Sequence, residues 1–144
     1  MRSLYLAFCL SLGPIAGAWA ADPATDPAKL QGTWQAVAAE RNGAPAPDAV
    51  GHRLVFTKDR FQITREGKLL YGGTYAADPS VQPARINFRQ EEGSTLRGEW
   101  KGIYRFEAGR LEIIDNADDM AKPAPAQFVT APGSGYVLLR FEPR

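Results

Sequence analysis

The chain has 144 residues, which suffices for one hydrophobic core, and its 17 basic and 16 acidic side chains leave it almost neutral. Nucleic-acid binders concentrate Lys and Arg on one face, whereas the arginines here are scattered along the chain, so no nucleic-acid partner is expected. A single cysteine, Cys9, excludes an internal disulfide, and with one histidine, His52, tetrahedral zinc is not expected either.

The first twenty residues have the three parts of a secretory signal peptide. Arg2 supplies the positive start, residues 4–12 are mostly apolar, and Ala-Trp-Ala at 18–20 fits the cleavage site. A membrane-spanning helix needs about 20 apolar residues, and Gly-Pro at 13–14 interrupts this segment early. We therefore expect residues 1–20 to be a signal peptide, no membrane span to remain after cleavage, and a periplasmic or secreted protein.

Residues 21–29 are rich in proline and aspartate and lack an apolar period, so they are expected to form a flexible leader. The helical candidate is a single turn at residues 27–30. After it, short runs alternate apolar and polar residues, which is the period of a half-buried strand. The expected strands are residues 33–39, 53–57, 60–64, 68–76, 85–89, 99–106, 111–113 and 136–141. The pair Gly72-Gly73 inside one run predicts a bulge or sharp bend.

About eight strands with turns between them indicate an all-β fold. Most links have hairpin length, which favours an up-and-down meander, and closing the meander would remove its exposed edges. The prediction is a small antiparallel up-and-down barrel that occupies residues 30–144.

Several motifs resemble a family of small lipocalin-like domains of unknown function, first collected from planctomycete proteomes. They are Gly32-Thr33-Trp34 at the start, the hairpin of residues 102–113, Pro125 to Phe128, and Gly-Ser-Gly-Tyr-Val-Leu-Leu at 133–139. The resemblance implies an eight-stranded barrel of lipocalin type and no assigned activity. It also implies a structural role for Trp34, packed across the closed end of the barrel, often under an arginine. Arg140 is the first candidate for that arginine and Arg105 the second.

Candidate catalytic and metal-binding residues each have a simpler interpretation. His52 lies in a loop and is expected to be solvated; Ser134 lacks the spacing of a nucleophile elbow and is expected in a turn. Glu91-Glu92 are neighbours that would point to opposite faces of a strand. The acidic run at 115–119 lacks the ligand pattern of a calcium loop and is expected to be a solvated loop. The sequence thus predicts a protein that is not an enzyme and has no metal or cofactor.

Aromatic residues are the most informative feature of the predicted strands. They either line a pocket for a small apolar ligand or fill the core, since an eight-stranded barrel is just wide enough for either. Their number favours a filled core. The candidate ligand-binding residues inside the barrel are Phe56, Phe61, Tyr71, Tyr75, Phe88, Trp100 and Tyr104.

Two functions remain open at this point. The first is an exported, non-enzymatic lipocalin-like domain that binds a small apolar ligand in the barrel. The alternative is a protein-interaction module, such as an envelope or secreted protease inhibitor that uses the leader as a trunk.

Overall fold

The computed structural model describes residues 22–93 and 98–144. The predicted signal peptide lies outside these described residues. A short 3-10 helix, η1 (Pro27–Leu30), precedes the strands and coincides with the predicted helical turn. The strands are β1 (Gly32–Arg41), β2 (Ala44–Pro45), β3 (Arg53–Thr57), β4 (Arg60–Arg65), β5 (Lys68–Asp78), β6 (Arg85–Gly93), β7 (Gly98–Glu107), β8 (Arg110–Asp115) and β9 (Val137–Pro143).

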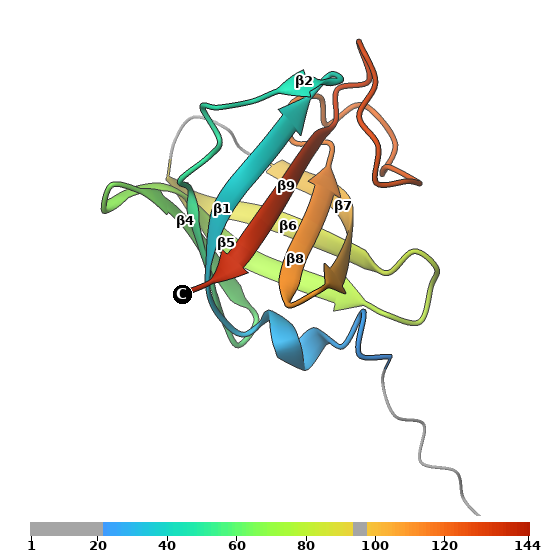
Figure 1. The fold of residues 1–144 in the computed structure, drawn as a ribbon. Coiled ribbons are helices and arrows are strands. Elements are labelled where there is room, and N and C mark those ends of the chain that lie inside the picture. The colour runs from blue at the N-terminus through green and yellow to red at the C-terminus, as the bar shows by residue number, and fades with distance from the viewer. Residues whose placement is uncertain (1–21, 94–97) are drawn as a thin grey trace, which may run out of the picture.

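The strands form one antiparallel sheet in which each long strand pairs with its neighbours in the sequence. β1 also pairs with β9, so eight strands close into a barrel, while the two-residue β2 adds to the end of β1 (Figure 1). In this view η1 lies below the barrel, and β2 and the loop between β8 and β9 lie above it. The predicted all-β, up-and-down, lipocalin-like barrel is confirmed.

Tight turns and one bulge shape the sheet. Asn42 and Gly43, with φ of 52° and 78°, join β1 to β2 in the left-handed conformation that these residue types tolerate. The predicted irregularity in β5 is a register shift between Gly72 and Gly73 against β6. A Cβ atom at Gly73 would lie 1.9 Å from the Arg89 carbonyl oxygen. β5 and β6 can therefore approach each other this closely only because residue 73 has no side chain.

Apolar side chains of the described residues form one main core and two smaller clusters. The main core fills the barrel, and it includes Leu54, Ile86 and Leu111, which are at most 2% exposed. A smaller cluster lies on the outer wall, where Ile103, Ile114 and Leu138 are covered by the loop that precedes β9. This loop therefore packs against the barrel, although its sequence has no strand period.

Residues 22–29, the described part of the segment expected to be a flexible leader, are packed against one end of the barrel instead. The Phe106 amide donates to the Ala24 carbonyl at 2.7 Å, and the Tyr104 hydroxyl donates to the Thr25 carbonyl at 2.6 Å. Leu30 of η1 is fully buried in the barrel core. The burial of Leu30 and the hydrogen bond from the Tyr104 hydroxyl stabilise this segment in one conformation. Its proline-rich sequence does not reveal these contacts.

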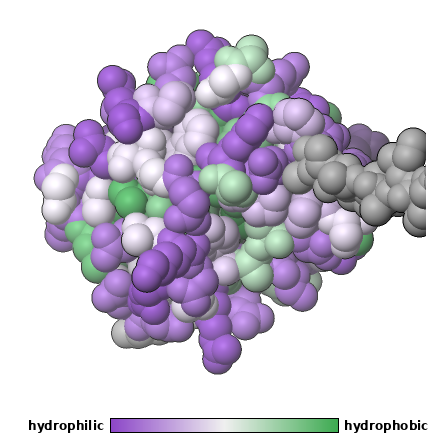
Figure 2. All heavy atoms as spheres, turned by 90° about the horizontal axis from the view of Figure 1, so that it is seen from below, coloured by the Kyte–Doolittle hydropathy of each residue, from purple (hydrophilic) through white to green (hydrophobic). Residues whose placement is uncertain are grey.

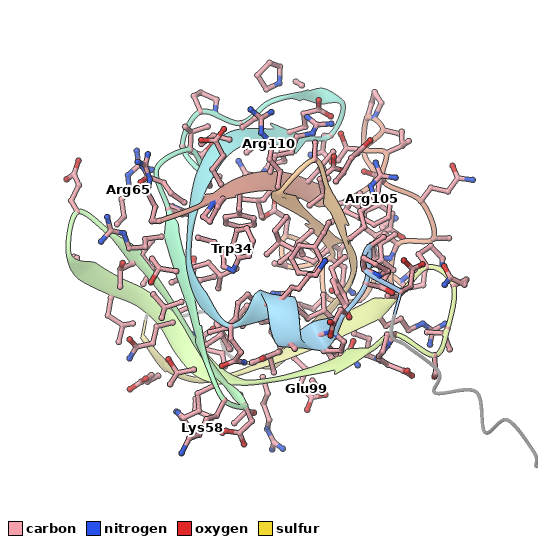
Figure 3. All side chains as sticks on the ribbon, turned by 60° about the horizontal axis from the view of Figure 1, so that its bottom comes forward. Trp34, Lys58, Arg65, Glu99, Arg105 and Arg110 are labelled. Atoms are coloured by element: carbon pink, nitrogen blue, oxygen red, sulfur yellow. The ribbon has the colours of Figure 1, made fainter. Side chains whose placement is uncertain are left out.

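We call this end the closed end. Viewed toward it, Trp34 lies inside the ring of strands, whereas Lys58, Glu99 and Arg105 lie outside (Figure 3). Its surface is mostly hydrophilic, with small separate hydrophobic spots (Figure 2).

Candidate functional site

The predicted ligand-binding aromatics occupy two kinds of position. Phe56, Phe61, Phe88, Trp100 and Tyr104 are at most 3% exposed, and Tyr71 and Tyr75 are half-buried. The middle of the barrel is filled by their contacts with one another. Phe61 meets Phe88 and Trp100 edge to face, with ring centroids 5.0 and 5.5 Å apart, and Phe88 stacks on Trp100 at 5.4 Å.

Tyr75 and Tyr104 make hydrogen bonds and packing contacts at the closed end. Tyr75 packs on Phe56, with centroids 4.5 Å apart, and its hydroxyl accepts a hydrogen bond from the Gln31 side-chain amide. Burial raises the pKa of Tyr104 to about 12, so its hydroxyl keeps the proton that it donates to Thr25. Of the seven predicted residues, only Tyr71 and Trp100 border the cavity described next.

That cavity lies at the end of the barrel opposite η1 and has a volume of about 130 Å³. We call it the open-end cavity. Its walls are mainly apolar, and three charged side chains, one imidazole and the phenol of Tyr71 also border it. The lining residues are Arg41, Ala49, His52, Ile63, Tyr71, Trp100, Asp115, Ala117, Asp118, Val137 and Leu139.

Strand register brings the polar and apolar walls together. Arg41 of β1 pairs with Val137 of β9, which pairs with Asp115 of β8, which pairs with Gly102 of β7. These four residues form one row across the barrel wall, although they come from distant parts of the sequence. Gly102 has no room for a side chain, because a Cβ there would lie 2.5 Å from the Ile114 carbonyl and 3.0 Å from the Asp115 Cβ.

Asp115 is a buried carboxyl group. Leu111, Ile113 and Asp115 alternate along β8 toward the interior, so the last of them enters the barrel although it is charged. It is 5% exposed, and burial raises its pKa to about 7, with a smaller contribution from the negative charge of Asp118. The prediction of a solvated acidic loop is therefore wrong for its first two residues, because Asn116 is buried as well.

The neighbour of Asp115 illustrates a purely structural polar residue. Asn116 is 1% exposed; its side-chain oxygen accepts from the Lys101 amide at 2.8 Å, and its side-chain nitrogen donates to the Lys122 carbonyl at 2.7 Å. By contrast, the hydrogen bond described for the Asp115 side chain is a local one, in which Oδ1 accepts from the Ala117 amide at 3.0 Å.

Arg41 holds the rim of the open-end cavity. Its terminal nitrogen donates to both carboxylate oxygens of Asp48, at 2.9 and 3.0 Å, and its Nε donates to Asp118. The hydrogen bond from Arg41 lowers the pKa of Asp48. Arg41 thus links the loop after β2 to the loop after β8.

His52 borders the same cavity and is half-buried, not fully solvated as predicted. Burial lowers its pKa, and the positive charges of Arg65 and Arg41 act in the same direction, against the charge of Asp48. Its imidazole is therefore neutral at pH 7.

The structural residues have partners that the resemblance did not indicate. Trp34 is 7% exposed, donates from Nε1 to the Leu30 carbonyl at 2.8 Å, and has its ring 5.8 Å from Phe106. Arg140 alternates with the inward-facing Leu139 and Phe141, so its side chain lies on the outer wall.

Outer-wall ion pairs replace the expected contact between an arginine and the indole. Arg140 pairs with Glu40 and Glu112, each at 3.6 Å. Arg105 also pairs with Glu112, at 3.0 Å, and lies over the Phe128 ring at 4.2 Å. Both arginines therefore help to fix the outer wall.

A second hollow lies outside the barrel, beside the closed end. It is an open groove of about 690 Å³ between the leader, the turn at residues 82–84 and residues 126–129. Because it is broader and more open to solvent, it encloses a small ligand less than the open-end cavity does.

Comparisons of the chain with known protein families, with curated proteins and with solved structures find no match. Within residues 22–93 and 98–144, no group of three or more His, Cys, Asp or Glu side chains is placed to hold a metal ion. Over that same part of the chain, no helix has the length and hydrophobicity needed to cross a bilayer.

Sequence reasoning located Tyr71 and Trp100 but missed Asp115, Arg41 and the role of His52. One signal was present, because Asp115 continues the apolar alternation of Leu111 and Ile113. The partners of Arg41 gave no signal, because they depend on how two loops meet.

Proposed function

We propose that the protein is an exported, non-enzymatic, lipocalin-like binding domain that holds a small ligand in the open-end cavity. Membership of the lipocalin-like family of unknown function and a periplasmic or secreted location are parts of this proposal. The observation that carries it is a cavity with apolar and aromatic walls and a few convergent polar groups, which is the usual composition of a small-molecule site.

The volume limits the ligand. A cavity of about 150 Å³ lined by apolar side chains binds benzene. At about 130 Å³, the open-end cavity matches a single ring or a short branched chain. A long acyl chain along the barrel axis has no place, because Phe61, Phe88 and Trp100 fill the middle of the barrel.

The residues around the cavity support binding more than catalysis. Its lining includes two side chains that could act as bases, His52 and Asp115, and none of the described lining residues is a serine, threonine or cysteine that such a base would activate. The proposal therefore assigns the cavity a binding role.

Native mass spectrometry of protein purified from the envelope of its own host tests this function. We expect a retained adduct of small mass that disappears in Ala117→Leu, because the larger side chain fills the cavity that Ala117 borders. Ala131→Leu is the matched control, since Ala131 is exposed and lies outside the cavity lining. An adduct that survives in Ala117→Leu, or the failure of every small apolar compound to bind purified protein, would refute the proposal.

The alternative, an inhibitor that inserts its leader into a protease cleft, has less support. Such a trunk must be free to enter the cleft, whereas Ala24, Thr25 and Leu30 are held against the barrel. The open groove beside the leader would be a more suitable surface for a protein partner.

A further inference from the structure

We infer that the ligand of the open-end cavity is a small organic cation, an amine with an apolar or aromatic body, for which Asp115 is the counter-ion. This inference rests on the proposed function and adds the chemical class of the ligand. It follows from the walls of the cavity, the balance of charge around it and the position of Asp115.

The walls suit the body of such a ligand. Trp100 and Tyr71 border the cavity with their rings 6.2 Å apart and at 70° to each other, and Ile63 and Leu139 complete the apolar surface. Indole and phenol faces attract cations as well as apolar groups, so these two rings accept either end of the ligand.

The charged side chains leave a surplus of acid. Arg41 is engaged by two carboxylates, Asp48 and Asp118, so its charge is already more than balanced. Arg65, farther out, donates to the Asp48 carbonyl. Asp115 adds a third carboxyl group to the same end, and neither arginine is among the causes of its pKa shift. This excess of negative charge would repel an anionic ligand, whereas a cationic ligand would neutralise it.

A structural role alone does not explain an acid at position 115. The hydrogen bond from the Ala117 amide needs one acceptor oxygen, which an asparagine of the same shape would supply. Burying a carboxyl group is costly unless a partner compensates for its charge. The neighbouring Asn116 shows that the same strand end uses an amide where the role is structural. An ammonium group in the cavity would be the compensating partner of Asp115.

Gly102 allows β7 to approach Asp115 closely. It pairs with Asp115 in the adjacent strand, and a Cβ there would lie 3.0 Å from the Asp115 Cβ. The absence of a side chain at residue 102 therefore lets Asp115 hold its position in the cavity lining.

The ionisation of Asp115 gives the inference a specific signature. Binding a cation favours the carboxylate, so affinity should be highest above pH 7 and fall by about tenfold per pH unit below the pKa of about 7. His52 gains charge at low pH and would act in the same direction. The ionisable groups that border or approach this end are Arg41, Asp48, His52, Arg65, Tyr71, Asp115 and Asp118.

Isothermal titration calorimetry with three probes of matched shape, benzylamine, benzyl alcohol and benzoate, tests the inference on the wild-type protein. At pH of about 8 we expect benzylamine to bind about tenfold or more tightly than benzyl alcohol, and benzoate to bind most weakly. The preference for the amine should decline as the pH falls through about 7.

Two variants show which side chain causes the preference for the amine and its pH dependence. Asp115→Asn should bind the amine and the alcohol equally and lose the pH dependence near 7. His52→Gln removes the charge that the imidazole gains at low pH, and it should keep the preference for the amine and its decline near pH of about 7. If Asp115→Asn does not fold, the pH profile of His52→Gln still decides whether a carboxyl group with a pKa near 7 controls binding.

The outcomes separate this inference from the proposed function. Equal binding of amine and alcohol by the wild-type protein, or tightest binding of benzoate, would overturn the cation and leave a ligand site. Binding of none of the three probes would overturn both.

Discussion

Replacing Asp115 by asparagine keeps the shape of the side chain and its acceptor for the Ala117 amide, and removes its titration. In the folded protein, burial raises the pKa of this carboxyl group from the ordinary 3.8 to about 7. The difference is about three pKa units, and each unit corresponds to about 1.4 kcal/mol. The largest effect on the free energy of unfolding is therefore on the order of 4 kcal/mol.

The direction follows from which state holds the proton more tightly. A raised pKa means that folded Asp115 keeps its proton at a pH at which the unfolded chain has lost it. Its contribution is therefore fully favourable below pH of about 4 and is lost as the pH rises toward about 7. Above that pH the folded protein contains a buried carboxylate, and no positive charge among the described residues contributes to its pKa. We expect Asp115→Asn to be the more stable protein there, by an amount approaching the full difference.

Urea unfolding, followed by tryptophan fluorescence between pH of about 4 and 8, measures this difference. The stability of the wild-type protein should fall relative to that of Asp115→Asn across this range. Asp119→Asn is the matched control, because the Asp119 carboxylate accepts from the Ala121 amide two residues on, as Asp115 does from Ala117, but in an exposed setting. Parallel pH profiles of the wild-type protein and Asp115→Asn would refute the account of this carboxyl group.

Three further changes test the closed end and the bulge. Tyr104→Phe removes the hydroxyl that binds Thr25, so we expect a loss of about 1 kcal/mol in urea unfolding and faster exchange of the Phe106 amide. Trp34→Phe removes the indole donor to the Leu30 carbonyl and should lower stability by about 1 kcal/mol or more, read from the urea midpoint. Gly73→Ala should lower stability by more than about 3 kcal/mol or prevent folding, judged by circular dichroism, because its Cβ would meet backbone at 1.9 Å.

Two of these changes, Tyr104→Phe and Gly73→Ala, have a comparison variant. Tyr136→Phe removes an exposed hydroxyl bond to Pro123 and should alter amide exchange near the leader little. Gly67→Ala meets no atom within 4 Å and carries only the strain of a φ of 77°, about 1 kcal/mol. Unchanged exchange of the Phe106 amide in Tyr104→Phe would contradict the anchoring of the leader. Equal effects of Gly73→Ala and Gly67→Ala would contradict the close approach of β5 and β6.

The apolar–polar periodicity of the sequence predicts most of the fold. Alternation in runs such as 53–57 and 85–89 is a local property, since every second side chain of a strand faces the core, and short turns then force neighbouring strands to pair. The same pattern could not reveal that the leader packs. Its order comes from the burial of Leu30 and from hydrogen bonds to Tyr104 and Phe106, which are far from the leader in the sequence.

The aromatic residues of the open-end cavity could be predicted from the sequence, but its position and its buried acid could not. Trp100 and Tyr71 were candidates because large aromatic residues in alternating strands must enter the barrel. Their neighbours fill the middle, and the open-end cavity lies at one end. Asp115 was assigned to a solvated loop because its composition is that of a turn, although the alternation of β8 carries it inward.

The sequence by itself determined an all-β chain with inward aromatic residues, because alternation and turn chemistry act between neighbours along the chain. Only the tertiary structure decided where a ligand would fit and which charges surround it. The physical reason is register: closing the barrel aligns Arg41, Val137, Asp115 and Gly102 in one row, and no local pattern specifies which strands will share that row.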